Sequence, residues 1–259
     1  MTDEHPAGDQ PSDERPTESE SAPPAAPRGR FTAPKGPTEA EKVQDQVSRQ
    51  AGLGPVAGGG GTLFSEPVLV VNQKTQIIEL VAEFLVFDQN GNKVGAVVEV
   101  GQSMVKQAAR LLTSLDQFMT HTFEIRDADD VTQLVLTRPR KIIKSKFELT
   151  RPDGSAVGEI VQKKRMGKIR FSLEAGGKVV GMMNAENWRA WNFNVQDASG
   201  EEVARITKTW EGLLKTAFTT ADNYVVHIHR PLEEPLRSLV VAAALCVDTA
   251  LKQDDRGLN

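Results

Sequence analysis

The chain has 259 residues, 39% of them hydrophobic and 25% charged, which is enough for one large domain or two small ones with a buried core. Its formal net charge of −4 gives no overall basic surface, and we expect no nucleic-acid partner. The single cysteine, Cys246, excludes an intrachain disulfide and is consistent with a reducing compartment.

Residues 1–60 have the composition of a disordered tail. They contain nine of the 14 prolines, ten acids, six bases and one aromatic residue, Phe31. Such a segment buries too little apolar surface to offset the entropy lost on ordering, and it lacks the apolar stretch of a secretory signal. It ends in Gly58–Gly61, which is typical of a flexible hinge. We predict a disordered acidic, Pro-rich tail over 1–60 and a folded domain over 61–255.

A short helix is predicted within this tail, near Thr38–Gln50. Thr38 and Glu41 have the spacing of a capping box, in which the two side chains satisfy free N–H groups at the start of a helix. The tail also carries the whole net charge of the chain, because the bases and acids of residues 61–259 balance. An acidic, Pro-rich tail of this kind is a candidate for recruiting a protein partner.

Strand-like runs recur from Leu63 onward, separated by turn residues. Residues 168–174 alternate strictly between charged or polar and apolar side chains, which is the pattern of a half-buried strand. Four pairs of runs flank Asn- and Gly-rich turns at Asp88–Asn92, Pro152–Gly154, Ala175–Gly177 and Asp197–Gly200, which favours antiparallel hairpins. The predicted strands are Val68–Val71, Ile77–Phe87, Lys93–Val100, His121–Arg126, Val131–Thr137, Lys144–Thr150, Ala156–Gln162, Lys168–Leu173, Lys178–Met183, Trp191–Val195, Glu202–Lys208 and Asn223–His229. The fold class is therefore all-β, with a short helix at Ser103–Leu115 on the rim.

The last predicted element is a helix over Pro235–Lys252. Its centre, Leu239–Val247, is apolar on every side, and it is shorter than the roughly 20 residues that span a bilayer. A helix that is apolar all round is buried on every side or inserted in lipid. A barrel of about twelve strands is too wide for its own side chains to fill. We therefore predict an antiparallel barrel around this helix, with Leu239, Val241, Ala242, Leu245 and Cys246 forming the core of the helix.

Residues 206–212 read Ile-Thr-Lys-Thr-Trp-Glu-Gly, and residues 216–224 read Thr-Ala-Phe-Thr-Thr-Ala-Asp-Asn-Tyr. This segment resembles the late part of phospholipid scramblases, in which a strand ending in Lys-x-Trp-x-Gly precedes an acidic Phe-Thr-Asp-Ala-Asp-Asn-aromatic stretch, a last strand and an apolar helix. The specific motif covers about residues 206–250, and the outline covers 61–255. The resemblance implies a tubby-like barrel and the binding or bidirectional movement of phospholipid. The wider superfamily, with its LURP-one-related and tubby members, has other roles as well.

The resemblance also implies calcium as a cofactor. The family assigns calcium to the acidic stretch and to carboxylates after the last strand, which places candidate ligands at Asp222, Asn223 and Glu233. Thr220 stands where an aspartate is usual, and Pro235 takes the final aspartate position, so the set is thin for an ion that takes six to eight oxygens. An Asx turn and an acidic helix start explain the same residues. The acylated cysteine cluster of many animal scramblases has no counterpart in this sequence.

A basic stretch is the candidate lipid-binding surface. Residues 138–170 contain eleven bases and three acids. Bases close to a membrane attract anionic lipid by about 1 kcal/mol each. A solvated outer barrel face is the alternative explanation. The candidate lipid-binding residues are Lys141, Lys144, Lys146, Lys163, Lys164, Arg165, Lys168 and Arg170.

The remaining candidates have structural explanations. His227 and His229 share one face of a strand, but two ligands do not make a metal site. Trp188, Trp191 and Trp210 suit a headgroup layer or ordinary packing. The sequence has no nucleophile elbow, P-loop or dinucleotide fingerprint, so we expect a protein that is not an enzyme.

Two functional hypotheses follow. In the first, a scramblase-like protein acts from the cytoplasm at the inner face of the plasma membrane, with an anionic phospholipid surface as its partner. In the second, the barrel is a soluble interaction scaffold, and the acidic Pro-rich tail recruits a protein partner. Binding to liposomes distinguishes the two hypotheses.

Overall fold

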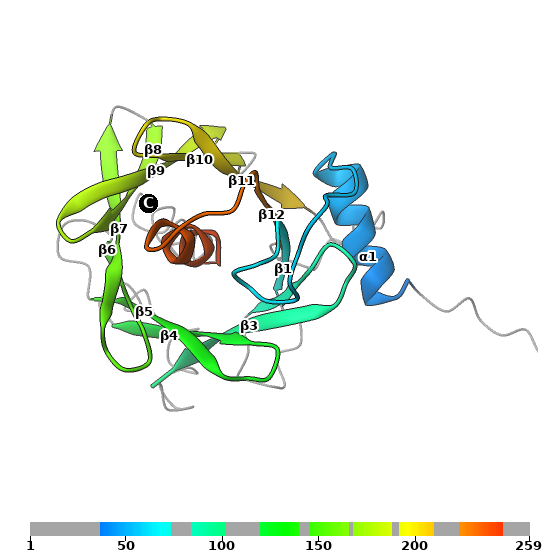
Figure 1. Cartoon of the computed structure of the whole chain (residues 1–259), viewed down its shortest axis with the longest axis horizontal. Coiled ribbons are helices and arrows are strands. Elements are labelled where there is room, and N and C mark those ends of the chain that lie inside the picture. The colour runs from blue at the N-terminus through cyan, green and yellow to red at the C-terminus, as the bar shows by residue number, and fades with distance from the viewer. Residues whose placement is uncertain are drawn as a thin grey trace, which may run out of the picture. The chain divides into compact units, whose positions relative to one another are not determined.

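The computed structural model describes residues 37–73, 84–101, 120–139, 146–165, 168–187, 192–209 and 223–245. Twelve strands in these residues form a closed antiparallel barrel in which each strand pairs with the next along the chain and β12 pairs with β1 (Figure 1). The strands are β1 (Val68–Gln73), β2 (Phe84–Phe87), β3 (Lys93–Val100), β4 (His121–Asp127), β5 (Thr132–Arg138), β6 (Lys146–Thr150), β7 (Ala156–Arg165), β8 (Lys168–Ala175), β9 (Lys178–Asn187), β10 (Asn192–Asp197), β11 (Glu202–Thr209) and β12 (Asn223–Ile228). The predicted all-β barrel of about twelve antiparallel strands is confirmed.

Several tight turns at one end of the barrel use the same local device. An aspartate carboxylate accepts hydrogen bonds from the backbone N–H groups two and four residues later. This occurs at Asp88, Asp127 and Asp197, with distances of 2.8–3.1 Å. Such Asx turns stabilise the reversal of the chain without help from the core. The sequence predicted the turns at Asp88 and Asp197 from the turn residues that follow them, which include Gly91 and Gly200.

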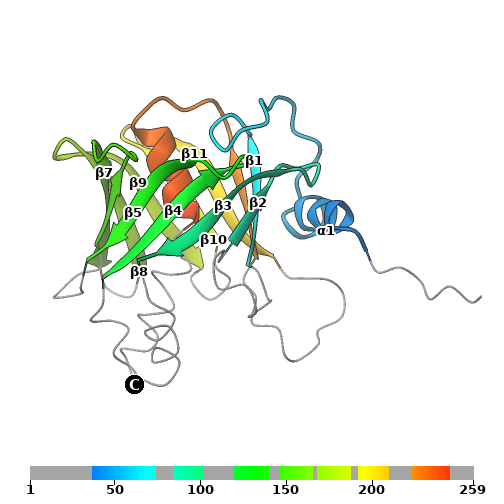
Figure 2. The same cartoon turned by 90° about the horizontal axis from the view of Figure 1, so that it is seen from below.

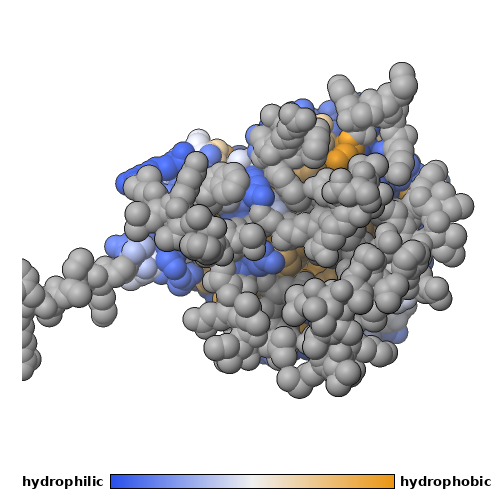
Figure 3. Space-filling model, turned by 180° about the vertical axis from the view of Figure 1, so that it is seen from behind, coloured by the Kyte–Doolittle hydropathy of each residue, from blue (hydrophilic) through white to orange (hydrophobic). Residues whose placement is uncertain are grey.

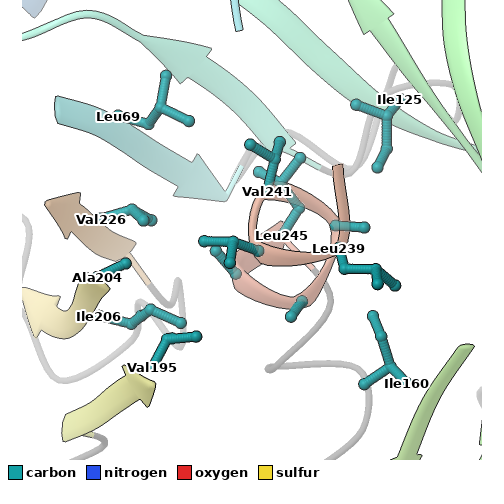
Figure 4. Packing of buried hydrophobic residues seen from close by; sticks show 14 of the residues in the cluster. Leu69, Ile125, Ile160, Val195, Ala204, Ile206, Val226, Leu239, Val241 and Leu245 are labelled. Atoms are coloured by element: carbon teal, nitrogen blue, oxygen red, sulfur yellow. The ribbon is translucent and has the colours of Figure 1, made fainter. Parts of the chain in front are cut away.

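The C-terminal helix lies inside the barrel and is described over residues 236–245 (Figure 2). We call it the inner helix. Its residues from Leu239 to Leu245 are 0–2% exposed and belong to one cluster with the inward side chains of the barrel (Figure 4). The predicted central helix is thereby confirmed, with Leu239, Val241, Ala242 and Leu245 in the core. Cys246 and the rest of the predicted helix lie outside the described residues.

Two glycines let the inner helix approach the barrel wall. A Cβ atom on Gly158, in β7, would lie 3.1 Å from a methyl carbon of Leu239 and closer still to the backbone of β8. A Cβ atom on Gly181, in β9, would lie 2.9 Å from a methyl carbon of Leu236. Interiors are close-packed, so a larger residue at either position would displace the helix.

A second helical segment packs on the outside of the barrel. It consists of α1 (Glu39–Asp45) and the π-helical η1 (Gln46–Gln50), and we call it the outer helix. Thr38 and Glu41 form the predicted capping box. Val43 and Val47 pack against Val68, Val70, Phe87 and Val225 on the outer face of β1, β2 and β12.

This packing corrects the predicted boundary of the tail. Residues 37–60 belong to the folded part of the chain, whereas the sequence assigned them to the disordered tail. The prediction rested on the average composition of residues 1–60, in which prolines and acids dominate. That average does not reveal that Val43 and Val47 are spaced one helical turn apart and can form an apolar stripe. Residues 1–36, the predicted helix at Ser103–Leu115 and the first part of the predicted strand at Ile77–Phe87 lie outside the described residues.

Candidate functional site

The predicted basic surface is described only in part. Lys141 and Lys144 lie outside the described residues, and so do the side chains of Lys164, Arg165 and Lys168. The described side chains are those of Lys146, Lys163 and Arg170, on the outer face of β6, β7 and β8.

Two of these three bases form ion pairs on the barrel surface. Lys146 Nζ lies 2.8 Å from Glu159 and 3.2 Å from Glu148, and Lys163 Nζ lies 2.8 Å from Glu174. The hydrogen bond to Glu159 contributes most to raising the pKa of Lys146, against the opposing effect of its partial burial. Because the side chains of Lys146 and Lys163 are 39% and 43% exposed, each pair adds little stability. The described middle of these strands is therefore a charge-balanced surface, and any excess of bases belongs to the strand ends.

The two ends of the barrel differ in the sequence of the segments that join the strands. In a meander of antiparallel strands, alternate connections lie at the same end. The five hairpin turns at one end are residues 88–92, 128–131, 151–155, 176–177 and 198–201. Their sequence contains five acids, one base and no aromatic residue. We call this the acidic end, and Lys93 and Lys178 are exposed beside two of its turns.

Strands at the other end are joined by segments that lie outside the described residues, namely 74–83, 102–119, 140–145, 166–167, 188–191 and 210–222. We call this the basic end. These segments contain eight bases and five acids in sequence, and they include Trp188, Trp191 and Trp210, which are all the tryptophans of the protein. Figure 3 looks onto this end, where hydrophobic side chains of the described barrel are visible.

None of the described helices is long and apolar enough to cross a membrane.

Of the three residues assigned to calcium by resemblance, the structure describes two, and they lie apart. Asn223 begins β12 at the basic end, whereas the exposed Glu233 follows β12 at the acidic end, at least the length of the strand away. Asn223 is fully buried, and its side-chain oxygen accepts the backbone N–H of Gln73 at 3.0 Å. Asp222 lies outside the described residues. The described chain also contains no cluster of three His, Cys, Asp or Glu side chains suited to a metal ion.

His227 and His229 contact each other on the outer face, as their spacing predicted. Their rings meet edge to face with centroids 4.8 Å apart. Burial, together with the neighbouring His229, lowers the pKa of His227. The carboxylate of Glu202 lies 3.9 Å from His229 Nε2. Two imidazoles that pack edge to face on the sheet surface explain this pair without a metal.

A buried ionisable pair inside the barrel was missed by sequence analysis. Glu99 on β3 and His121 on β4 are 4% and 1% exposed, and Glu99 Oε1 lies 2.6 Å from His121 Nδ1. Arg138 lies opposite His121 on β5 and is also buried. The signal available in the sequence was a charged residue at an inward-facing position of a strand. Glu99 comes two residues after the inward-facing Val97, and Arg138 comes two residues after the inward-facing Leu136.

A pocket of about 420 Å³ opens at the acidic end, where the chain enters the barrel as the inner helix. Its walls are the link from the outer helix to β1 and the link from β12 to the inner helix, and they include Phe64, Glu66, Arg230 and Arg237. Arg237 is paired with Glu234 at 2.9 Å and lies over the ring of Phe64. Gly58 and Gly59, which the sequence assigned to a flexible hinge, form part of the wall.

Comparisons with known proteins bear on the whole barrel. The family model described as "Scramblase" matches residues 57–251. The chain is 23% identical to "Altered inheritance rate of mitochondria protein 25" of Saccharomyces cerevisiae over 198 residues, which cover 64% of this chain and 59% of that protein. It therefore spans about three fifths of the length of this relative. An X-ray structure of an Arabidopsis thaliana protein aligns with a TM-score of 0.43 and 13% identity, over 73% of this chain and 98% of the other.

Proposed function

Because the chain belongs to the scramblase family, we propose that it binds phospholipid at a membrane surface and moves it between the two leaflets. The observation that carries this proposal is the family match over residues 57–251, which includes every strand of the barrel. Family membership supports a lipid-related, non-catalytic role. Binding and movement of phospholipid are the finer steps that we propose.

The architecture favours contact through the outside of the barrel. The described part of the interior is occupied by the inner helix, whose side chains from Leu239 to Leu245 are 0–2% exposed against the inward side chains of the barrel. The basic end is the part of the surface whose sequence best suits a membrane, because tryptophans settle in the headgroup layer and bases attract anionic headgroups. We propose that this end faces the membrane, with Lys141, Lys144 and Lys168 among its contacts.

We propose a peripheral location at the inner face of the plasma membrane. The name of the yeast relative refers to the inheritance of mitochondria, which makes a mitochondrial membrane the alternative location to examine. Cell fractionation with markers for both membranes distinguishes these locations.

Flotation with liposomes tests the proposed function. The full chain should float with phosphatidylserine-containing vesicles and much less with pure phosphatidylcholine, and added salt should weaken the association. The double variant Lys141→Glu with Lys144→Glu should lose flotation. The matched control, Lys93→Glu with Lys178→Glu, makes the same charge change at the acidic end and should float like the unaltered protein.

A scrambling assay then tests movement. The protein is reconstituted into vesicles with a fluorescent lipid, and the fraction of lipid accessible to a membrane-impermeant quencher is followed with and without calcium. Protein-dependent scrambling in either condition supports the proposal, and the difference between the two conditions measures the effect of calcium.

A second function is favoured by the composition of the tail. Residues 1–36 are acidic and Pro-rich, a composition suited to recruiting a protein partner, and the barrel would then be a soluble scaffold. Absence of flotation, together with binding of a partner that requires residues 1–36, would favour this scaffold over the membrane protein.

A further inference from the structure

The pocket at the acidic end lies between two links that hydrogen bonds hold in place (Figure 2). In the link before β1, the backbone N–H of Val56 donates to Gln89 Oε1 at 3.0 Å, and Gln89 Nε2 donates to the carbonyl of Val56 at 2.7 Å. At the end of β12, the backbone N–H of Ile228 donates to the carbonyl of Pro67 at 2.8 Å. A volume of about 420 Å³ between such walls is within the range of small-molecule sites.

One carboxylate in this pocket lacks a counter-charge. Glu66 lines the pocket and is 6% exposed, and its Oε1 accepts the backbone N–H of Gly61 at 2.7 Å. Its Oε2 has neither a hydrogen-bond donor nor an ion-pair partner among the described residues. This oxygen is not sealed from solvent, so it faces the pocket. Because a buried carboxylate is costly without a partner, Oε2 is an acceptor that a ligand's donor group can satisfy.

The arginines in the pocket wall are already paired with acids. Arg237 donates to Glu234 through Nε at 3.0 Å and through Nη2 at 2.9 Å. Arg230 donates to Asp197 at 2.7 Å. Of the arginine and glutamate side chains that line the pocket, Glu66 is therefore the one whose charge is not balanced. An anion entering the pocket would be repelled by this carboxylate, whereas a cation would be attracted to it.

The geometry of this acceptor favours an ammonium group among organic cations. A guanidinium binds best to both oxygens of a carboxylate, but Oε1 of Glu66 is already bonded to Gly61. A quaternary ammonium has no N–H group to donate. A primary ammonium is a compact charge with three donors, one of which is enough for Oε2. The apolar side chains of Val56, Phe64 and Leu232 in the wall suit the alkyl chain that carries it.

We propose that this pocket binds a primary alkylammonium group, with the ammonium on Glu66 Oε2 and the alkyl chain against the apolar wall. A free amine and a lysine side chain of a bound peptide share this chemistry. The inference goes beyond the proposed function and does not depend on it. The pocket opens at the acidic end, whereas the basic end is the one that we propose to face the membrane.

Titration of the isotope-labelled full chain with n-butylammonium tests the proposal. The amide resonance of Gly61 should shift to saturation, because its N–H is bonded to the same carboxylate, and the dissociation constant should lie in the millimolar range. Two probes of similar size serve as controls. We expect n-butanol, which lacks the charge, and tetramethylammonium, which lacks the N–H, to bind at least about tenfold more weakly.

A pair of variants tests the role of the carboxylate. Glu66→Gln removes the charge and keeps an oxygen for Gly61, and it should weaken binding of n-butylammonium at least about tenfold. Glu233→Gln is the matched control, because it removes the same charge from an exposed position at the same end of the barrel, and it should bind like the unaltered protein. Thermal unfolding of both variants verifies that they are folded, and the probe series on the unaltered protein needs no variant.

Each outcome supports or overturns the proposal. If Gly61 does not shift, if n-butanol or tetramethylammonium binds as tightly as n-butylammonium, or if Glu66→Gln binds like Glu233→Gln, the proposal is wrong. Blocked lysine, Nα-acetyl-lysine amide, distinguishes the two sources. Tighter binding than that of n-butylammonium supports a peptide lysine, and weaker binding supports a free amine. Glu66→Gln should float with liposomes like the unaltered protein, so loss of the proposed function and loss of this site are measured separately.

Discussion

The inner and outer helices lie on opposite sides of the same barrel wall and are built from opposite sequences. Between Leu239 and Leu245 all seven consecutive residues of the inner helix are buried, whereas the outer helix buries two valines and a glutamine in twelve residues. A helix enclosed by a barrel meets apolar neighbours in every direction. A helix on the outer surface meets them along one stripe. The fraction of a short helix's circumference that is apolar therefore indicates how many of its sides are covered by the rest of the protein.

The largest difference between the helices should come from burying a charge. Val241→Asp places an unpaired carboxylate in the middle of the core, and we expect no folded protein. Val43→Asp, on the outer helix, should leave the barrel folded because the charge can reach water when the helix detaches. Soluble yield and circular dichroism measure both. A folded Val241→Asp variant would contradict the central position of the inner helix.

Removing methyl groups should give the next largest effect. Leu245→Ala should lower the free energy of unfolding by about 2–5 kcal/mol, the usual range for a core leucine. Val47→Ala should cost about 1 kcal/mol, because its surroundings on the outer face collapse or rehydrate easily. Urea denaturation without lipid measures both. A change below about 0.5 kcal/mol for Leu245→Ala would be incompatible with its burial.

Truncation at two positions should sharpen the boundary between tail and fold. Removing residues 1–36 should leave the midpoint of thermal unfolding within a degree or two, as expected for a Pro-rich acidic segment. Removing residues 1–58 also removes the outer helix and exposes the apolar side chains of β1, β2 and β12 beneath it. We expect about 1–3 kcal/mol of lost stability, because the exposed apolar area is partly offset by the entropy of the segment no longer ordered. Equal midpoints for the two truncations would contradict the outer packing.

The smallest expected effect is the loss of stability at low pH that comes from Glu234, at the start of the inner helix. Burial acts to raise the pKa of Glu234, but hydrogen bonds from Ser238 and Arg237 outweigh it, so the pKa lies below its ordinary value. A carboxyl with a lowered folded-state pKa contributes stability above its unfolded pKa and loses it as pH falls through the folded pKa. Because Glu234 is largely exposed to solvent, the contribution is a few tenths of a kcal/mol.

Glu234→Gln should therefore destabilise the protein slightly at neutral pH and make no difference once the carboxyl is protonated. Urea midpoints measured from neutral pH down through the glutamate range test this. At the outer helix, hydrogen bonds with Thr38 lower the pKa of Glu41. The same substitution at Glu41 provides a comparison at a fully exposed cap. If the urea midpoint of Glu234→Gln still falls with pH as in the unaltered protein, other carboxylates are responsible for the pH dependence.

Strand positions were predictable because their signals are local. Alternation in residues 168–174 and the turns beginning at Asp88 and Asp197 act within a few residues, and the corresponding strands formed where expected. Charge pairing on the candidate surface was not readable in the same way. A count of bases along residues 138–170 includes Lys163, but its partner Glu174 lies on the neighbouring strand β8, outside that window.

The sequence by itself determined the number and order of the strands, the apolar helix at their centre, and the family to which the chain belongs. Tertiary structure alone decided that the outer helix packs on the barrel, that Asn223 and Glu233 lie at opposite ends, and that Glu99 meets His121 inside. The physical reason is the distance along the chain over which each kind of interaction acts. Periodicity and turn chemistry act between residues close in the chain, whereas pairing of charges and covering of a surface depend on which strands the closed barrel makes neighbours.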